Sequence, residues 1–176
     1  MSKILIMYQS KYGATKKYAE WLSEELSCDL IETQKANIDK IKKYDTIILG
    51  GGIYATGISG ISFLKKNYKK LMDKKIAIFA VGASPYNDAA FKALKEHNLK
   101  DNLNNIPCFY CRGSWNEDKM SWKDKTLCTM LKKFVAKKDP ADYEPWEYAL
   151  MQAIGSQFDW TEKENLKPIL EFIQTK

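Results

Sequence analysis

The chain has 176 residues, of which 45% are hydrophobic and 28% are charged, so it is long enough to bury the core of one compact domain. Its apolar runs are shorter than the roughly 20 residues of a membrane-spanning helix, and its four cysteines lack the paired spacing of a zinc site, so we expect a cytosolic protein without a metal centre. The net charge of +6, with lysines on nearly every predicted helix, leaves a peripheral membrane contact open, whereas no stripe of basic and aromatic residues indicates nucleic-acid binding.

Hydrophobic periodicity predicts alternating strands and helices along most of the chain. Short apolar runs that end in polar or glycine-rich loops are typical of strands buried on both faces, and apolar side chains at helical spacing predict amphipathic helices between them. The predicted strands cover residues 3–8, 28–32, 45–49, 75–81 and 106–111. The predicted helices cover residues 14–26, 63–72, 88–94 and 127–135. We place the glycines at positions 50–52 in the turn after the third strand.

The order of these elements indicates an α/β fold. Strands that alternate with helices are joined by right-handed crossovers, which gives a parallel sheet with helices on both faces. Residues 1–176 then form a single domain whose core lies in about residues 1–138. Residues 139–176 add C-terminal helices outside this core, and Pro168 is expected to kink or delay the last of them.

Ligands of an open parallel sheet bind beyond the carboxyl ends of its strands. Three predicted loops leave such ends, at residues 9–15, 50–59 and 82–88. The first loop combines the hydroxyls of Ser10 and Thr15, a turn at Gly13 and the free N–H groups of a helix that begins near Ala14. Because a helix N-terminus carries about half a positive charge, it can hold a phosphate group. A turn that only caps the helix is the alternative.

The segment that ends at Thr15 resembles the phosphate-binding signature of flavodoxins, which is roughly T/S-x-T-G-x-T. Ser10, Gly13 and Thr15 match it, whereas Tyr12 and Ala14 stand where that family usually has threonine and asparagine. The resemblance implies a flavodoxin-like three-layer α/β sandwich, with a five-stranded parallel sheet in the order 2-1-3-4-5. It also implies flavin mononucleotide (FMN) as the cofactor, with its phosphate in this loop.

In flavodoxin-like proteins the second and third loops hold the isoalloxazine ring, and each often supplies an aromatic side chain that stacks on it. Tyr54 and Tyr86 occupy those positions here, and Trp115 is a third candidate. Each tyrosine could also be an ordinary surface aromatic. The cofactor-binding positions implied by the resemblance are Ser10, Lys11, Tyr12, Gly13, Ala14, Thr15, Gly51, Gly52, Ile53, Tyr54, Ala55, Gly57, Gly82, Ala83, Ser84, Tyr86 and Trp115.

Three later motifs resemble a branch of the flavodoxin family that includes menaquinone-dependent protoporphyrinogen dehydrogenase. They lie at residues 109–113, 119–121 and 158–160, so the resemblance covers nearly the whole chain. That enzyme typically carries an arginine in its second loop, where this sequence has Ile53-Tyr54-Ala55. Cys108 and Cys111 form a C-x-x-C pattern inside a predicted strand, and we interpret them as buried thiols rather than a redox pair.

We therefore expect an electron-transfer flavoprotein that binds FMN, with a redox protein or a small quinone or porphyrin as its partner. The alternative is an FMN-dependent oxidoreductase of the protoporphyrinogen or menaquinone dehydrogenase type, in which residues 112–122 and the basic surface recruit the substrate. A receiver-like signalling domain is a further alternative, but it requires acidic residues where Tyr8-Gln9-Ser10 stand. The loops contain no recognisable set of catalytic residues.

Overall fold

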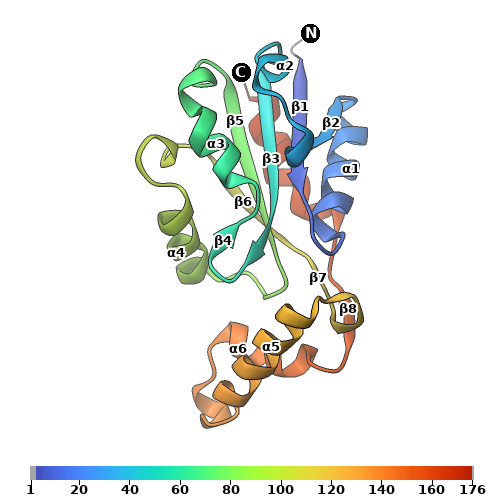
Figure 1. Ribbon diagram of the computed structural model, residues 1–176, viewed down its shortest axis with the longest axis vertical. Coiled ribbons are helices and arrows are strands. Elements are labelled where there is room, and N and C mark those ends of the chain that lie inside the picture. The colour runs from blue at the N-terminus through green and yellow to red at the C-terminus, as the bar shows by residue number, and fades with distance from the viewer. Residues whose placement is uncertain (1–2, 176) are drawn as a thin grey trace.

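A computed structural model describes residues 3–175 of the chain. Its main sheet contains β1 (Ile4–Gln9), β2 (Asp29–Glu32), β3 (Thr46–Tyr54), β4 (Gly57–Ile58), β5 (Lys75–Gly82) and β6 (Cys108–Arg112). Five of these strands are parallel in the spatial order β2-β1-β3-β5-β6, and the short β4 pairs antiparallel with the end of β3. Figure 1 shows the carboxyl ends of the parallel strands at one end of the molecule. The predicted α/β sheet with the order 2-1-3-4-5 is confirmed, counting the parallel strands alone.

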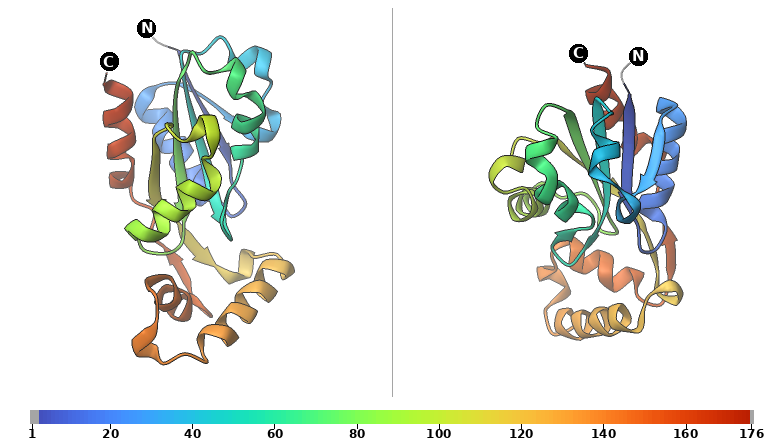
Figure 2. Two further views of the ribbon diagram at one scale, coloured as in Figure 1. Left: turned by 90° about the vertical axis from the view of Figure 1, so that its left-hand side faces the viewer. Right: turned by 45° about the horizontal axis from the view of Figure 1, so that its top comes forward.

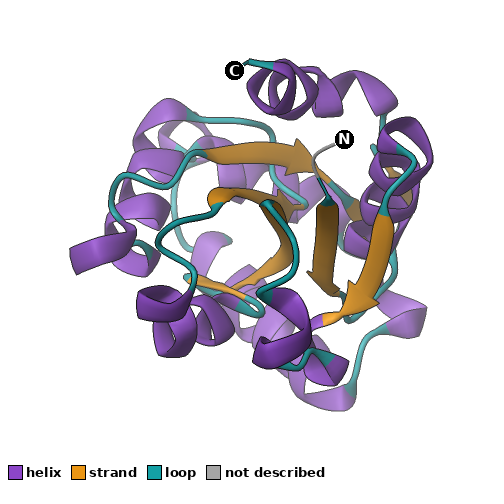
Figure 3. Ribbon diagram, turned by 90° about the horizontal axis from the view of Figure 1, so that it is seen from above, coloured by secondary structure: helices purple, strands orange, loops and turns teal. Residues whose placement is uncertain are grey.

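Helices cover both faces of this sheet (Figures 2 and 3). The helices are α1 (Ala14–Leu26), α2 (Ile38–Ile41), α3 (Ile61–Asn67), α4 (Asp88–Asn98), α5 (Trp122–Val135), α6 (Pro145–Ala153) and α7 (Lys167–Gln174). Neighbouring strand residues point to opposite faces, as the pleat requires. Ile6 packs with residues of α1 and α7, whereas Met7 packs with residues of α2, α3 and α4. The sheet is therefore buried on both sides, which explains why its strands are almost continuously apolar.

Three consecutive glycines lie inside β3, and the turn predicted for residues 50–52 is wrong. A Cβ atom on Gly50 would lie 2.1 Å from the Cζ atom of Phe79, whose ring is fully buried. A Cβ atom on Gly51 would lie 2.3 Å from the carbonyl oxygen of Ser59. The glycines thus let a large ring and a neighbouring chain approach the strand closely. The chain turns later, where Ala55 has a φ of 53°.

The C-terminal helix α7 completes the core, which corrects the expected core boundary near residue 138. Leu166 and Ile169 are buried against the face of the sheet that α1 also covers. Pro168 stands in the first turn of α7, where its missing N–H needs no partner, so it does not interrupt the helix. The amphipathic helix at residues 127–135, which we expected on the sheet, does not take this place.

Residues 114–159 instead form an excursion between β6 and α7, which we call the lobe. It contains α5, α6 and two short antiparallel strands, β7 (Ser114–Asn116) and β8 (Gln157–Asp159). Figures 1 and 2 show α5 and α6 beyond the carboxyl ends of the sheet strands, at the end of the molecule opposite both termini. The lobe therefore lies beside the loops in which ligands of such sheets bind. Among residues 3–175, no helix is long and apolar enough to cross a membrane.

Candidate functional site

The loop between β1 and α1 presents backbone N–H groups at its surface. The residue before α1 is Gly13, which has a φ of 102°, and no side chain caps the helix. The hydroxyl oxygen of Ser10 accepts a hydrogen bond from the N–H of Gly13 at 3.1 Å, which folds the loop back on itself. A Cβ atom on Gly13 would have no other atom within 4 Å. The first turn of α1 thus has no side-chain cap, and the space around Gly13 is open, as an anion site at a helix N-terminus requires.

Ala14 and Thr15, which follow Gly13 in the predicted loop, pack against the rest of the fold. Thr15 is buried in the first turn of α1. Ala14 lies against the turn after β6, because a Cβ atom on Gly113 would be 3.4 Å from that of Ala14. The small Ala14 side chain therefore lets the N-terminus of α1 approach this turn closely. The site depends on backbone donors more than on side chains.

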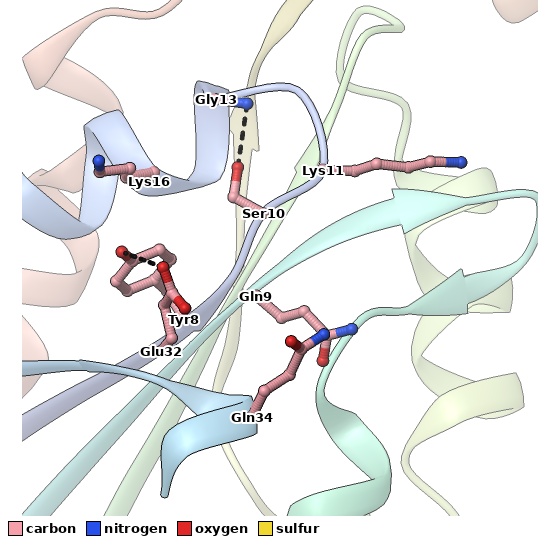
Figure 4. Close-up of a pocket in the computed structure, with 8 residues that line it drawn as sticks. All are labelled: Tyr8, Gln9, Ser10, Lys11, Gly13, Lys16, Glu32 and Gln34. Atoms are coloured by element: carbon pink, nitrogen blue, oxygen red, sulfur yellow. Dashed lines mark hydrogen bonds between the residues drawn. The ribbon is translucent and has the colours of Figure 1, made fainter. Parts of the chain in front are cut away.

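A cavity of about 310 Å³ lies beside this loop, at the carboxyl ends of β1 and β2 (Figure 4). Its lining residues are Tyr8, Gln9, Ser10, Lys11, Gly13, Lys16, Glu32 and Gln34. The phenol of Tyr8 donates a hydrogen bond to Glu32 at 3.4 Å, and the ammonium group of Lys35 holds the pKa of Glu32 below its ordinary value. The cavity adjoins the phosphate loop on the β2 side, away from the second and third loops.

Lys11 and Tyr12 connect the phosphate loop to the lobe. Lys11 forms an ion pair with Asp124 in α5, and the phenol of Tyr12 donates a hydrogen bond to the same carboxylate. The phenol oxygen of Tyr12 also accepts a hydrogen bond from the N–H of Ser121 at 3.2 Å. These contacts with Lys11 and Tyr12 lower the pKa of Asp124. Because Asp124 already neutralises Lys11, this lysine adds little net charge to the first loop.

Tyr54 joins the second loop to the first. Its ring folds back over the backbone of β3, since a Cβ atom on Gly52 would lie 2.9 Å from a carbon of that ring. The rings of Tyr54 and Tyr12 meet edge to face, with centroids 6.1 Å apart and an interplanar angle of 71°. The Lys11 ammonium lies 5.5 Å from the centre of the Tyr54 ring, and burial raises the pKa of the Tyr54 phenol.

The other predicted residues of the second loop form a tight hairpin. Ile53 pairs with Ile58, and Tyr54 pairs with Gly57, so Ala55 and Thr56 form the turn. Gly51 and Gly52 lie in the preceding strand and keep its backbone accessible to close neighbours. The second loop is therefore a rigid extension of the sheet.

The third loop places Tyr86 away from Tyr54. The ring of Tyr86 lies 5.7 Å from the rings of Phe91 and Tyr110, and its phenol donates a hydrogen bond to Asp88 at 2.8 Å. The two tyrosines that were expected to hold one ring thus have different neighbours, because Tyr54 contacts the first loop and Tyr86 contacts α4 and β6.

The start of the third loop nevertheless meets the second loop. A Cβ atom on Gly82 would lie 3.1 Å from the terminal methyl group of Ile53 and 2.9 Å from the phenol oxygen of Tyr110. The carbonyl oxygen of Ser84 accepts a hydrogen bond from the same phenol, and that of Ala83 accepts one from Arg112 at 3.4 Å. Gly82, Ala83 and Ser84 are thus fixed through β6.

Arg112 and two tryptophans mark the start and end of the lobe. The guanidinium group of Arg112 lies 4.2 Å from the centre of the Trp160 ring, and that ring stacks on Phe158 with centroids 4.9 Å apart. Trp115 pairs with Phe158 across the two short strands. Its indole N–H is buried and has no hydrogen-bond partner among the described residues. The region thus offers a cation, aromatic faces and one free buried donor.

The cysteines of the C-x-x-C pattern lie in β6, where Cys111 is buried and Cys108 is half-buried. Burial raises the pKa of Cys108 and of Cys111 to about 12, so both thiols stay protonated at neutral pH. Within residues 3–175, no three histidine, cysteine, aspartate or glutamate side chains gather as metal ligands would.

The contribution of α5 to the phosphate loop was not predicted. Ser121 accepts a hydrogen bond from the N–H of Asp124 and caps α5, and this Ser-x-x-Asp pattern is a recognisable helix start. The pattern indicates where α5 begins but not which loop its first turn contacts. Gln34 and Glu32 were also missed as neighbours of the phosphate loop, although the pairing of β1 with β2 places them there.

Comparison with known proteins shows what this chain is similar to. The family model described as flavodoxin domain matches residues 5–143. An uncharacterized protein of Methanocaldococcus jannaschii is 32% identical over 115 residues, which cover 63% of this chain and 75% of that protein. The structure of Trp repressor binding protein from Bacillus subtilis has a TM-score of 0.49 at 16% identity, over 63% of this chain and 85% of the other. The structure of a flavoprotein of Lactobacillus acidophilus in complex with FMN has a TM-score of 0.44 at 18% identity. The match covers 64% of this chain and 93% of the other.

Proposed function

Because this chain belongs to the flavodoxin domain family, we propose that it binds FMN and exchanges electrons with a partner. The observation that carries this proposal is the uncapped N-terminus of α1, which follows β1 at the carboxyl edge of a parallel sheet. The strand order reverses at this point, and such positions bind ligands in open α/β sheets. Bound FMN would supply reversible electron transfer at its isoalloxazine ring.

The residues of the first loop fit a phosphate group. The backbone N–H groups of the first turn of α1 would donate hydrogen bonds to it, and the left-handed conformation of Gly13 keeps the approach free of a side chain. Ser10 would hold the loop in shape through its bond to Gly13. Lys11 and Tyr12 would instead fix the position of α5 beside the site.

The second and third loops would hold the flavin ring. Tyr54 offers a half-buried aromatic ring next to the backbone of Gly52, and aromatic faces pack well against flat rings. The backbone of Gly82 approaches Ile53 from the neighbouring strand. The unpartnered N–H of Trp115 is a candidate donor to a bound group. These contacts would exclude water from one side of the ring and so influence its reduction potential.

The absorbance spectrum of the purified protein tests this proposal. Bound oxidised flavin absorbs near about 370 and 450 nm, and mass spectrometry of the released cofactor distinguishes FMN from riboflavin and FAD. We expect FMN at up to one equivalent per chain, either as purified or after adding FMN to colourless protein. A colourless protein that leaves added FMN free in solution would show the proposal to be wrong.

A second candidate function is favoured by the pairing of Arg112 with Trp160. Arg112 stands at the end of β6 and contacts the third loop, and a guanidinium group binds carboxylates through paired hydrogen bonds. The site could thus act as an FMN-dependent oxidoreductase on an anionic aromatic substrate such as a porphyrinogen, with a quinone as acceptor. We would expect turnover of protoporphyrinogen with menaquinone, and a higher KM for Arg112→Ala. Absence of turnover by the flavin-loaded protein would eliminate this candidate.

A further inference from the structure

The net charge of the chain is concentrated in residues 119–138, which we call the basic segment. It contains seven of the 28 basic residues and one of the 22 acidic residues, so the remaining 156 residues carry 21 of each. Lysines occur on nearly every predicted helix, but outside this segment acidic residues balance them. All seven basic residues are lysines, at positions Lys119, Lys123, Lys125, Lys132, Lys133, Lys137 and Lys138.

Helix α5 forms the middle of the basic segment and exposes large apolar side chains. Trp122, Met130 and Phe134 are 73%, 64% and 61% exposed, and Leu127 is also exposed. Seven of the nine large hydrophobic side chains that are exposed in residues 3–175 lie between residues 122 and 158, within the lobe. An exposed apolar group of this kind marks an interaction surface.

The lysines of the basic segment are nearly all free to meet an external anion. In the described part of the chain, only Lys138 among the seven forms an ion pair, with Glu147. The single acidic residue of the segment, Asp124, is engaged by Lys11 outside it. Lysine and aromatic groups also lie close together, since the Lys123 ammonium is 5.8 Å from the centre of the Trp122 ring.

We propose that α5 and the basic segment dock on an anionic lipid surface. A helix that carries tryptophan, phenylalanine and leucine together with many lysines is typical of helices that lie in the plane of a membrane interface. Each lysine close to anionic headgroups adds attraction. A protein partner fits less well, because protein interfaces favour arginine and are depleted of lysine, and the basic segment has no arginine.

Docking through α5 would bring the carboxyl end of the sheet to the lipid surface. The first turn of α5 contacts the phosphate loop through Ser121 and Asp124, and the lobe lies beyond the ends of the strands (Figure 1). A bound flavin would then lie near lipid-soluble electron carriers. This consequence rests on the proposed function, whereas the docking itself does not.

Sedimentation with lipid vesicles tests the docking. We expect the full chain to pellet with vesicles that contain phosphatidylglycerol, to stay in solution with pure phosphatidylcholine vesicles, and to bind less as salt is raised. Replacing Lys132 and Lys133 by glutamine should weaken binding by about tenfold or more. The matched control replaces Lys65 and Lys66, an exposed lysine pair on α3, by glutamine and should bind like the unmodified chain.

Two further variants separate apolar contact from charge. Met130→Ser should reduce vesicle binding, whereas Met72→Ser, at a residue that is 69% exposed and far from the lobe in sequence, should not. The fluorescence of Trp122 should shift to shorter wavelength on binding, and the part of the shift due to this residue should disappear in Trp122→Phe. Met130→Ser, Met72→Ser and Trp122→Phe all change exposed side chains, so we expect each variant to fold. Circular dichroism checks this.

Three results would overturn the proposal. The first is that the unmodified chain fails to pellet with anionic vesicles while it remains folded. The second is that the Lys132 and Lys133 variant binds as tightly as the Lys65 and Lys66 control. The third is that the chain forms a dimer which Phe134→Ser dissociates while vesicles remain unbound, because α5 would then be covered by a second copy of the chain. None of these measurements needs bound FMN, so this proposal and the proposed function can fail separately.

Discussion

The parallel sheet and the lobe differ in where they place their large apolar side chains. Ile48 and Phe79 in the sheet are completely buried, whereas Trp122 and Phe134 in α5 are exposed. The sheet can therefore hold its loops in place through its own packing. The lobe contacts the first loop through polar groups, chiefly Asp124. The position of the first loop therefore depends on the sheet, while the position of α5 relative to that loop depends on a few hydrogen bonds and ion pairs.

The largest expected difference is in the free energy of unfolding that is lost when one large side chain is truncated, either in the core of the sheet or in the lobe. Ile169→Ala removes a fully buried side chain of α7 and should lower the free energy of unfolding by about 2–5 kcal/mol. Phe134→Ala in α5 should change it by less than about 0.5 kcal/mol. Urea denaturation measures both. Equal costs would mean that Phe134 is packed as tightly as Ile169, which would contradict the exposure of α5.

Tyr18 tests the junction between the sheet and the C-terminal segment. Its phenol donates a hydrogen bond to the carbonyl of Arg112 and accepts bonds from the N–H of Glu162 and the side chain of Asn165. Tyr18→Phe leaves these part-buried groups without this partner and should cost about 1–3 kcal/mol. The control is Tyr148→Phe, whose exposed phenol binds only the carbonyl of Pro140 in the lobe. If Tyr148→Phe lowered the free energy of unfolding as much as Tyr18→Phe does, the lobe would be as tightly bonded as the sheet. That result would contradict the difference between the two regions.

Asp159 provides a pH-dependent contact between the lobe and α1. Burial alone would raise its pKa, but the Lys17 ammonium and the hydroxyl and N–H of Thr161 outweigh that effect and hold the pKa at about 2. Because the folded pKa lies below the usual carboxyl value, this contact stabilises the fold above about pH 4 and is lost as the pH falls toward 2. Lys17→Met should raise the pKa of Asp159 in an NMR titration, and Lys16→Met should leave it unchanged. A pKa that stays near 2 in Lys17→Met would disprove the assigned cause.

The smallest expected effect is a difference in the rate at which two cysteines react with a thiol reagent. It involves no change in the stability of the fold. Cys111 lies in the sheet with a pKa of about 12 due to burial, whereas Cys128 is half-buried in α5. In variants that retain one cysteine each, a thiol reagent at pH 8 should label Cys128 faster than Cys111. Equal rates in the native protein would show that β6 opens as readily as the lobe.

The parts of the fold that could be predicted from sequence depend on local patterns. The apolar run of β1 and the helical spacing of α1 are adjacent in the chain, and together they place the loop around Gly13 correctly. The turn predicted at the glycines of β3 is wrong because contacts from other segments explain them: Gly50 faces Phe79, and Gly51 faces the backbone of Ser59. Hydrophobic periodicity also does not indicate which of two amphipathic helices covers the sheet. The pattern therefore predicts α5 on the face of the sheet that α7 covers in the structure.

The polar contacts of the candidate site could not be predicted in the same way. Lys11 and Asp124 are 113 residues apart, and neither residue type nor spacing indicates that they meet. The resemblance to flavodoxins indicates which loops to compare, but not the neighbours of their side chains: Tyr54 meets Tyr12, and Tyr86 meets Tyr110. Side-chain direction at the ends of loops depends on packing between distant segments.

We propose that backbone groups at the start of α1 hold the phosphate of FMN. Placing a negative charge beside that phosphate, and comparing the affinities for FMN and riboflavin, tests this proposal. FMN and riboflavin differ only by the phosphate, and Gly13→Asp and Gly13→Asn place similar side chains on the same left-handed residue. We predict that the unmodified protein binds FMN more tightly than riboflavin, and that Gly13→Asp binds FMN at least about tenfold more weakly than Gly13→Asn while riboflavin binds both variants equally. Equal binding of FMN and riboflavin by the unmodified protein would contradict the claim.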